Sequence, residues 1–183
     1  MCSEGLSVNL MNSRKVLVEK FLCRTAWHNA NRVHLAGDAS NRRYERLELG
    51  CARAVLMDAP DSDESVCTFI VIANLLRSLG LSAPEIIEAN ISDGLLLLED
   101  YGDTTYTERI SAGVEEVKLY GLAVDVLIHL HRSYKDNKTI PPYDDDLLLK
   151  EAGLCINWYM PAVLSIKPFD QVKLAYSAAW KSV

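Results

Sequence analysis

The order in which strand and helix patterns follow one another constrains this fold most. Short runs rich in apolar and β-branched residues alternate with turn residues, which is typical of strands. The predicted strands lie at residues 33–36, 44–49, 52–57, 85–89 and 95–99. Gly50 fits a turn between the second and third strands, and Gly94 ends a Ser-Asp-Gly turn between the last two.

Helical patterns interrupt and follow these strands. Acidic N-cap candidates open residues 61–79, and Gly80 is a natural stop. The strongest helical pattern, at residues 115–131, has apolar residues at three- and four-residue steps: Leu119, Leu122, Ala123, Val126, Leu127 and Leu130. Further helices are predicted at residues 12–29, 144–159 and 171–180. The order of three strands, one helix and two strands before a helical region predicts an α+β fold.

Composition narrows the class of protein. The chain has 183 residues, 49% of them apolar, which is enough to bury a core. A net charge of −6 argues against nucleic acid as a main partner. The five cysteines lie far apart without a C-x-x-C pair, so we expect reduced, mostly buried thiols. No signal pattern or long apolar run is present, and we expect no membrane contact and a cytoplasmic location.

One turn between strands is a candidate phosphate-binding element. Small residues allow main-chain N–H groups to approach a nucleotide's phosphates closely. The turn consists of Gly37, Asp38, Ala39 and Ser40. By itself the same sequence also fits an ordinary hairpin turn, so the neighbouring motifs matter.

Several motifs in order resemble the aminoglycoside phosphotransferase family, and within it the bacterial kinases that phosphorylate N-acetylmuramate and N-acetylglucosamine. They occupy residues 37–44, 55–60, 96–103, 119–120, 130–131, 141–144 and 158–159. The resemblance implies a protein-kinase-like fold: an N-terminal helical segment (1–32), a nucleotide-binding N-lobe (33–102) and part of a helical C-lobe (103–183).

The resemblance also implies site residues and ligands. ATP with Mg²⁺ would be the cofactor, and an amino sugar the substrate. The turn at residues 37–40, with Arg43, would lie over the phosphates. The linker, residues 98–101, would pair with adenine through its backbone and consists of Leu98, Glu99, Asp100 and Tyr101. Tyr143 and Asp144 would help to form the sugar pocket.

Two departures from the kinase pattern concern activity. The third strand carries no lysine for the phosphates, and Arg42 or Arg43 is an alternative source of that charge. The catalytic H-x-D-x-x-x-x-N motif and the later metal-binding aspartate do not occur, so the resemblance implies a chain cut before its catalytic loop, with no catalytic residue and no metal ligand of its own. We therefore expect an inactive portion of a cell-wall sugar kinase. The alternative is a degenerate module that binds nucleotide or a protein partner without catalysis.

Other polar residues have more than one interpretation. His129 and His131 are two residues apart on a predicted helix, which is poor spacing for metal ligands. Asp100 and Asp103 fit either a contact to ribose or substrate hydroxyls or a turn. Residues 144–146 fit a helix cap better than a cation site. The apolar stripe of residues 119–130 predicts self-association if its cover is missing.

Overall fold

The computed structural model describes residues 3–35, 41–60, 63–135, 140–165 and 168–182, with side chains described from residue 13 in the first helix and from residue 66 in the second. The chain divides into two compact units, Met1–Tyr134 and Lys135–Val183. Each unit is described by itself. The lobe boundaries at 32/33 and 102/103 remain a prediction.

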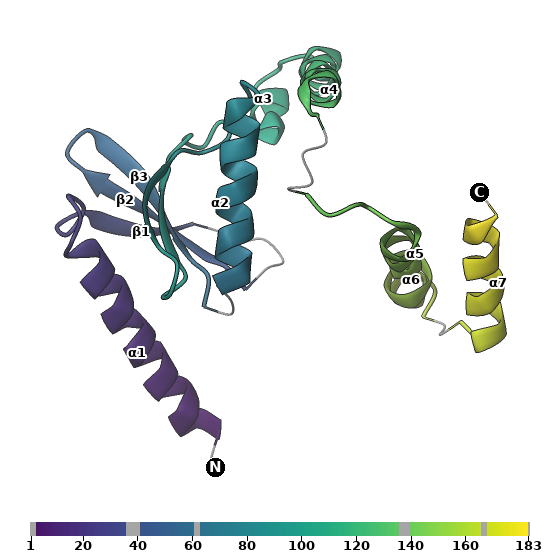
Figure 1. The fold of residues 1–183 in the computed structure, drawn as a ribbon, viewed down its shortest axis with the longest axis horizontal. Helices are drawn as coiled ribbons and strands as arrows, with labels where there is room; N and C mark the ends of the chain where they lie inside the picture. Colours follow the sequence, from purple (N-terminus) through teal and green to yellow (C-terminus); the bar gives the residue numbers. More distant parts are fainter. Residues whose placement is uncertain (1–2, 36–40, 61–62, 136–139, 166–167, 183) are drawn as a thin grey trace. The chain divides into compact units, whose positions relative to one another are not determined.

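The first unit contains a five-stranded antiparallel sheet (Figure 1). Its strands are β1 (Asn31–Leu35), β2 (Arg43–Leu49), β3 (Ala52–Asp58), β4 (Ile86–Asn90) and β5 (Leu95–Glu99), in the spatial order β1-β2-β3-β5-β4. Helix α2 (Asp63–Ser78) lies between β3 and β4 in the sequence. The α+β prediction and its order of three strands, one helix and two strands are confirmed.

Two helices cover opposite faces of this sheet. Helix α1 (Ser3–Leu22) starts earlier and ends earlier than predicted. Its buried residues Val18, Phe21 and Leu22 form one cluster with Leu47, Ala54, Leu56, Leu95 and Leu97 of the strands. Helix α2 packs on the other face, where Val66, Phe69 and Ile70 contact Met57, Leu96 and Leu98. Because successive strand residues point to opposite faces, β3 and β5 serve both clusters.

The turn before β5 depends on one glycine. Gly94 has a φ of 66°, and a Cβ built there would lie 2.2 Å from the carbonyl oxygen of Ala59. The two residues are also joined by a hydrogen bond, which the Ala59 N–H donates to the Gly94 carbonyl at 2.9 Å. Gly50, in the β2–β3 turn, has a similar φ of 60° but open space around it. Gly94 is therefore required by packing as well as by conformation.

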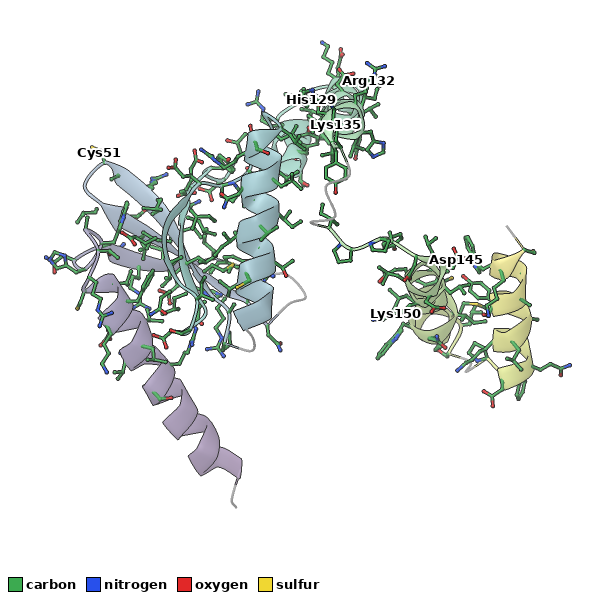
Figure 2. The ribbon with its side chains drawn as sticks, in the orientation of Figure 1. Cys51, His129, Arg132, Lys135, Asp145 and Lys150 are labelled. Carbon is green, nitrogen blue, oxygen red and sulfur yellow. The ribbon has the colours of Figure 1, made fainter. Side chains whose placement is uncertain are left out.

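Two helices follow the sheet in the first unit. Helix α3 (Tyr106–Ser111) begins with a capping box in which Thr105 and Glu108 exchange hydrogen bonds. Helix α4 (Glu116–Ser133) agrees with the strongest predicted helix, but none of its residues is buried. Nε2 of His129 on this helix lies 2.8 Å from the carbonyl oxygen of Leu79, the residue after α2. His129 is labelled in Figure 2. The His129 ring thus has a structural partner.

The second unit is a short helical segment. Helix α5 (Asp145–Leu154) continues through a π-helical turn (Cys155–Tyr159) into α6 (Met160–Leu164), and α7 (Asp170–Lys181) follows. Ile156 is buried, and the Tyr176 hydroxyl donates a hydrogen bond to the Ala152 carbonyl at 3.0 Å. These contacts join α7 to α5.

The prediction of mostly buried thiols was wrong. The four cysteines that the structure describes, Cys23, Cys51, Cys67 and Cys155, are free and exposed. Cys51 shows the reason most simply, because it lies at the tip of the β2–β3 hairpin (Figure 2). Separately, no helix in the described ranges is both long enough and apolar enough to span a bilayer.

Candidate functional site

Four strands place a row of side chains on the face of the sheet that α2 partly covers. Val33 is opposite Arg46, Arg46 is opposite Val55, and Val55 is opposite Leu98. Directly opposed residues in antiparallel strands share a face. Val55 and Leu98 belong to the α2 cluster, so the whole row lies on the α2 face.

Helix α2 covers only part of that face. Met57, Leu96 and Leu98 are buried beneath it. By contrast, Val33 is 43% exposed, while Leu35, Tyr44 and Val55 are only partly buried. The β1–β2 side of the α2 face is thus an open, mainly apolar surface, and we call it the open patch (Val33, Leu35, Tyr44 and Val55). Such a surface suits a flat apolar group.

The linker leaves β5 beside the open patch. Leu98 is buried, and the Glu99 carboxylate accepts the Glu85 N–H at 3.1 Å. In the described part of the chain, the N–H and C=O groups of Asp100 and Tyr101 make no hydrogen bond to another backbone group. Those main-chain groups remain available to a ligand with donors and acceptors along one edge.

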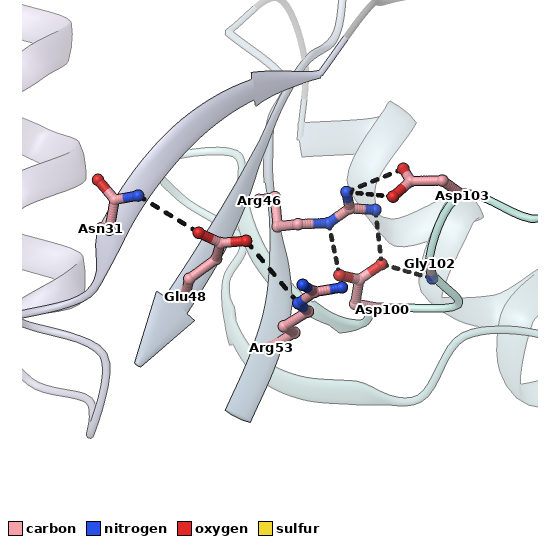
Figure 3. Close-up of polar contacts among 7 residues, drawn as sticks. All are labelled: Asn31, Arg46, Glu48, Arg53, Asp100, Gly102 and Asp103. Atoms are coloured by element: carbon pink, nitrogen blue, oxygen red, sulfur yellow. Dashed lines mark hydrogen bonds and ion pairs between the residues drawn. The ribbon is translucent and has the colours of Figure 1, made fainter. Parts of the chain in front are cut away.

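A buried ion pair holds the first turn of this segment. Arg46 donates to Asp100 Oδ2 through Nε at 2.7 Å and to Oδ1 through its second terminal nitrogen at 3.1 Å (Figure 3). The remaining terminal nitrogen lies 2.8 and 2.9 Å from the two oxygens of Asp103. The Asp100 carboxylate also accepts the Gly102 N–H at 2.8 Å. One guanidinium therefore joins β2 to two carboxylates around the linker.

Burial and charge set the protonation of this group. The side chains of Arg46 and Asp100 are only 11% and 3% exposed, whereas Asp103 is 65% exposed. Burial of the Asp100 carboxyl opposes its ionisation, but the hydrogen bonds from Arg46 and Gly102 outweigh burial and hold its pKa below the usual value. The hydrogen bonds that Arg46 donates to Asp100 and Asp103 raise the pKa of Arg46 above its usual value. Both partners are charged near neutral pH.

Tyr101 differs from Asp100 in its surroundings. Its side chain is 55% exposed. Partial desolvation and the negative charge of Glu99 raise the pKa of its hydroxyl, which therefore stays protonated near neutral pH. The Tyr101 hydroxyl interacts with Glu99 and Arg77.

The strand position next to the open patch is apolar rather than cationic. Met57 points to the α2 face and is fully buried against Val66 of α2 and Leu96 of β5. Apolar packing therefore joins β3 to the first turn of α2 here. Asp58 points the opposite way and binds Arg14 of α1 at 2.7 Å.

The two candidate arginines lie on different faces. Arg43 lines a pocket of about 440 Å³ with Arg14, Lys15 and Asp58 on the α1 face. Arg42 instead places its guanidinium 5.6 Å from the ring centre of Phe69 on α2. Arg42 therefore lies on the same face as the open patch, and the structure does not bring Arg43 together with the linker.

Other predicted residues are only partly located. Gly37, Asp38, Ala39 and Ser40 lie outside the described residues. Asp144 accepts the Leu147 N–H at 2.9 Å and caps α5, as expected for a turn aspartate. Tyr143, beside it, is exposed. Their proposed contact with substrate remains a prediction.

The described side chains do not form a metal site. Among them, no group of three or more His, Cys, Asp and Glu residues is arranged to hold an ion. Asp100 and Asp103, the carboxylates around the linker, are both bound to Arg46. We therefore assign no metal ligand in this part of the chain.

Sequence comparisons supply the remaining evidence. No protein-family model matches the chain. An N-acetylmuramate/N-acetylglucosamine kinase of Caulobacter vibrioides is 32% identical over 212 residues, which include 96% of this chain. Kinases of the same name from Pseudomonas putida and Pseudomonas aeruginosa are 35% and 33% identical, over 81% and 75% of this chain. The chain is thus similar to part of the N-acetylmuramate/N-acetylglucosamine kinases.

The similarity to these kinases covers only part of their length. The chain spans 58% of the Caulobacter vibrioides kinase and 42% and 40% of the two Pseudomonas kinases. The matched part of this chain is most of its length, including the sheet unit in the Caulobacter comparison. The activity of the whole kinases is therefore a matter for proposal here.

Arg46 is the site residue that sequence reasoning missed. A basic residue between Tyr44 and Leu47 in a strand predicts only a solvated face. Its partner Asp100 is 54 positions away in the sequence. In the sheet, β3 lies between β2, which carries Arg46, and β5, which ends just before Asp100. The sequence does show two aspartates, Asp100 and Asp103, around Tyr101-Gly102. It does not show which cation binds them, because that depends on the register of the sheet.

Proposed function

We propose that the sheet unit is the nucleotide-binding N-lobe of an ATP-dependent amino-sugar kinase with a protein-kinase-like fold. The similarity to kinases of that name carries this proposal. Three strands, one helix and two strands, followed by a linker and helices, is the layout that the family resemblance implies. Cytoplasmic location remains a prediction.

The geometry supports adenine as the group bound at the linker. The open patch offers apolar side chains to the flat face of a purine. Asp100 and Tyr101 offer main-chain donors and acceptors to its edge. Leu98 and Val55 close the inner end of the surface. These residues would orient the base and exclude water from it, and the turn at residues 37–40 would lie over the phosphates.

Mg²⁺ has no ligands among the described residues, and we derive no step through it. The sequence also lacks the H-x-D-x-x-x-x-N motif that would position the acceptor hydroxyl. We propose that these 183 residues bind nucleotide without transferring its phosphoryl group. Magnesium-dependent phosphorylation of an amino sugar by this chain would contradict that statement.

A second function is favoured by one observation. The third strand carries no lysine for the phosphates, and its Met57 packs against Val66 of α2. A degenerate module that binds nucleotide weakly, or only contacts a protein, fits the absence of that lysine. Exposed apolar residues of the stripe on α4, such as Leu122 and Leu127, fit the predicted self-association.

Calorimetric titration with ATP tests the two functions. We expect the chain to bind ATP with a measurable dissociation constant, with and without Mg²⁺. Gly37→Trp should abolish or strongly weaken binding, because a bulky side chain would obstruct the phosphate-covering turn. Gly50→Trp is a matched control, since Gly50 lies in the turn after β2, whereas residues 37–40 precede β2, and has open space around it.

Two results would separate the proposals. Binding that Gly37→Trp removes and Gly50→Trp retains supports a nucleotide lobe. A folded wild-type chain without any ATP binding contradicts it and leaves the protein-contact module. Size-exclusion chromatography then tests self-association directly.

A further inference from the structure

We infer that Arg46 is a positioning residue that holds the linker in the conformation needed to bind the nucleotide base. This inference rests on the proposed function and adds a residue-specific device to it. It concerns an arginine on β2, two strands away from the strand that leads into the linker.

The Arg46 side chain extends from β2 across the sheet to the linker. Arg46 lies between Val33 and Val55 in the row across the α2 face. Its guanidinium nevertheless contacts Asp100, just beyond β5. The side chain therefore extends from within the row that includes Val33 and Val55, across β3, to the residue that follows β5.

The contact between Arg46 and Asp100 also fixes a backbone turn. Asp100 binds Arg46 with both oxygens, and one of these oxygens also accepts the Gly102 N–H. Gly102 has a φ of 74°, so the chain reverses there. Asp103 joins the same guanidinium after the turn. Arg46 thus binds Asp100 and Asp103, which lie on either side of Tyr101 in the sequence.

Arginine supplies a fork of donors that lysine does not offer. A planar guanidinium donates two parallel hydrogen bonds to one carboxylate and a further pair to another. Lysine carries the same charge but cannot form this fork. The orientation of the linker should depend on the fork, since Asp100 and Tyr101 have no backbone partner of their own in the described residues.

This role predicts a selective loss of base recognition. If Arg46 acts through the linker, its replacement should weaken the binding of adenosine and the binding of ATP to a similar extent. Binding of inorganic tripolyphosphate, which has no base, should be unchanged. A direct contact between Arg46 and phosphates predicts the opposite selectivity.

The test combines hydrogen exchange with ligand binding on the full chain. The variants are Arg46→Met and Arg46→Lys, and the control is Arg32→Met, which removes an ion pair to Glu45 on the opposite face of the sheet. Amide exchange at residues 100–103 reports the linker. Titrations with ATP, adenosine and tripolyphosphate report binding.

We expect both Arg46 variants to speed amide exchange at residues 100–103. They should also lower the affinity for adenosine and for ATP about 10-fold, as loss of one charge-assisted contact would. Arg46→Lys, the more conservative variant, should fold even if Arg46→Met does not. Arg32→Met should change neither readout.

Three results would overturn the inference: unchanged linker exchange, unchanged adenosine affinity, or a loss confined to ligands with phosphates. A wild-type chain that binds neither adenosine nor ATP would instead refute the proposed function, and with it the nucleotide role of Arg46. In that case the exchange data would still show whether Arg46 holds the linker, so the two failures are distinguishable.

Discussion

The sheet unit and the helical unit are packed very differently. Of the buried hydrophobic residues in the described ranges, all but Ile156 belong to residues 1–134. In the helical unit, large side chains such as Trp158 and Phe169 are 74% and 79% exposed. The sheet has helices on both faces, whereas α5 and α7 share few contacts. Fold and candidate site therefore depend mainly on the first unit.

This difference in packing bears on the two proposed sites, one for the nucleotide and one for the sugar. A closed core holds Arg46, Asp100 and the open patch in fixed relative positions. The residues proposed for the sugar pocket, Tyr143 and Asp144, lie in the loosely packed unit. Nucleotide binding is accordingly the part of the proposal that this structure supports best.

The largest expected effect tests the close packing of the sheet unit. Gly94→Ala should lower the free energy of unfolding by about 4 kcal/mol, because strain at positive φ adds to a clash with the Ala59 carbonyl. Gly50→Ala is the matched control and should cost about 1 kcal/mol, from backbone strain alone. Chemical denaturation measures both. Equal losses would show that the approach to Ala59 is not tight.

A smaller effect, with a pH signature, tests the buried ion pair. Arg46→Met should lower the free energy of unfolding by about 3 kcal/mol near neutral pH, because Asp100 would stay buried without its cation. The pKa of Asp100 is lowered in the folded chain, so its stabilising contribution exists above the unfolded pKa of about 4 and is lost as pH falls through the folded value.

The difference between wild type and Arg46→Met should therefore narrow below about pH 4. Thermal or urea unfolding between about pH 3 and 7 measures it. A difference that stays constant across this range would mean that Asp100 and Arg46 are not paired in solution.

The smallest effect belongs to the helical unit. Asp144→Ala should destabilise α5 by about 1 kcal/mol, because the Leu147 N–H loses its cap. Asp146→Ala, in the first turn without a capping bond, should cost only a few tenths of that. Hydrogen exchange at the amides of α5 measures both. Similar effects of the two substitutions would argue against the cap.

Local signals explain why most of the fold was predictable. Turn residues such as Gly50 and Gly80 mark where strands and helices end, and three- and four-residue steps mark α4. One local signal was overlooked, since Thr105 and Glu108 form a capping box that identifies α3. These features depend on neighbours in sequence, so no tertiary information was needed.

The candidate site was predictable only in part. The linker follows from the sequence pattern, but its attachment to Arg46 depends on the register of four strands. The separation of Arg42 and Arg43 onto two faces likewise depends on where β2 begins. Cysteine burial failed for a related reason, because hydrophobicity does not say which face of an element is covered.

An NMR titration of the labelled chain with ATP tests the central claim most directly. The account predicts the largest shift changes in the amides of residues 98–103 and in the methyl groups of Val33 and Val55, because the base would lie between them. Changes confined to the pocket on the α1 face, around Arg43 and Asp58, or no changes in a folded chain, would contradict it.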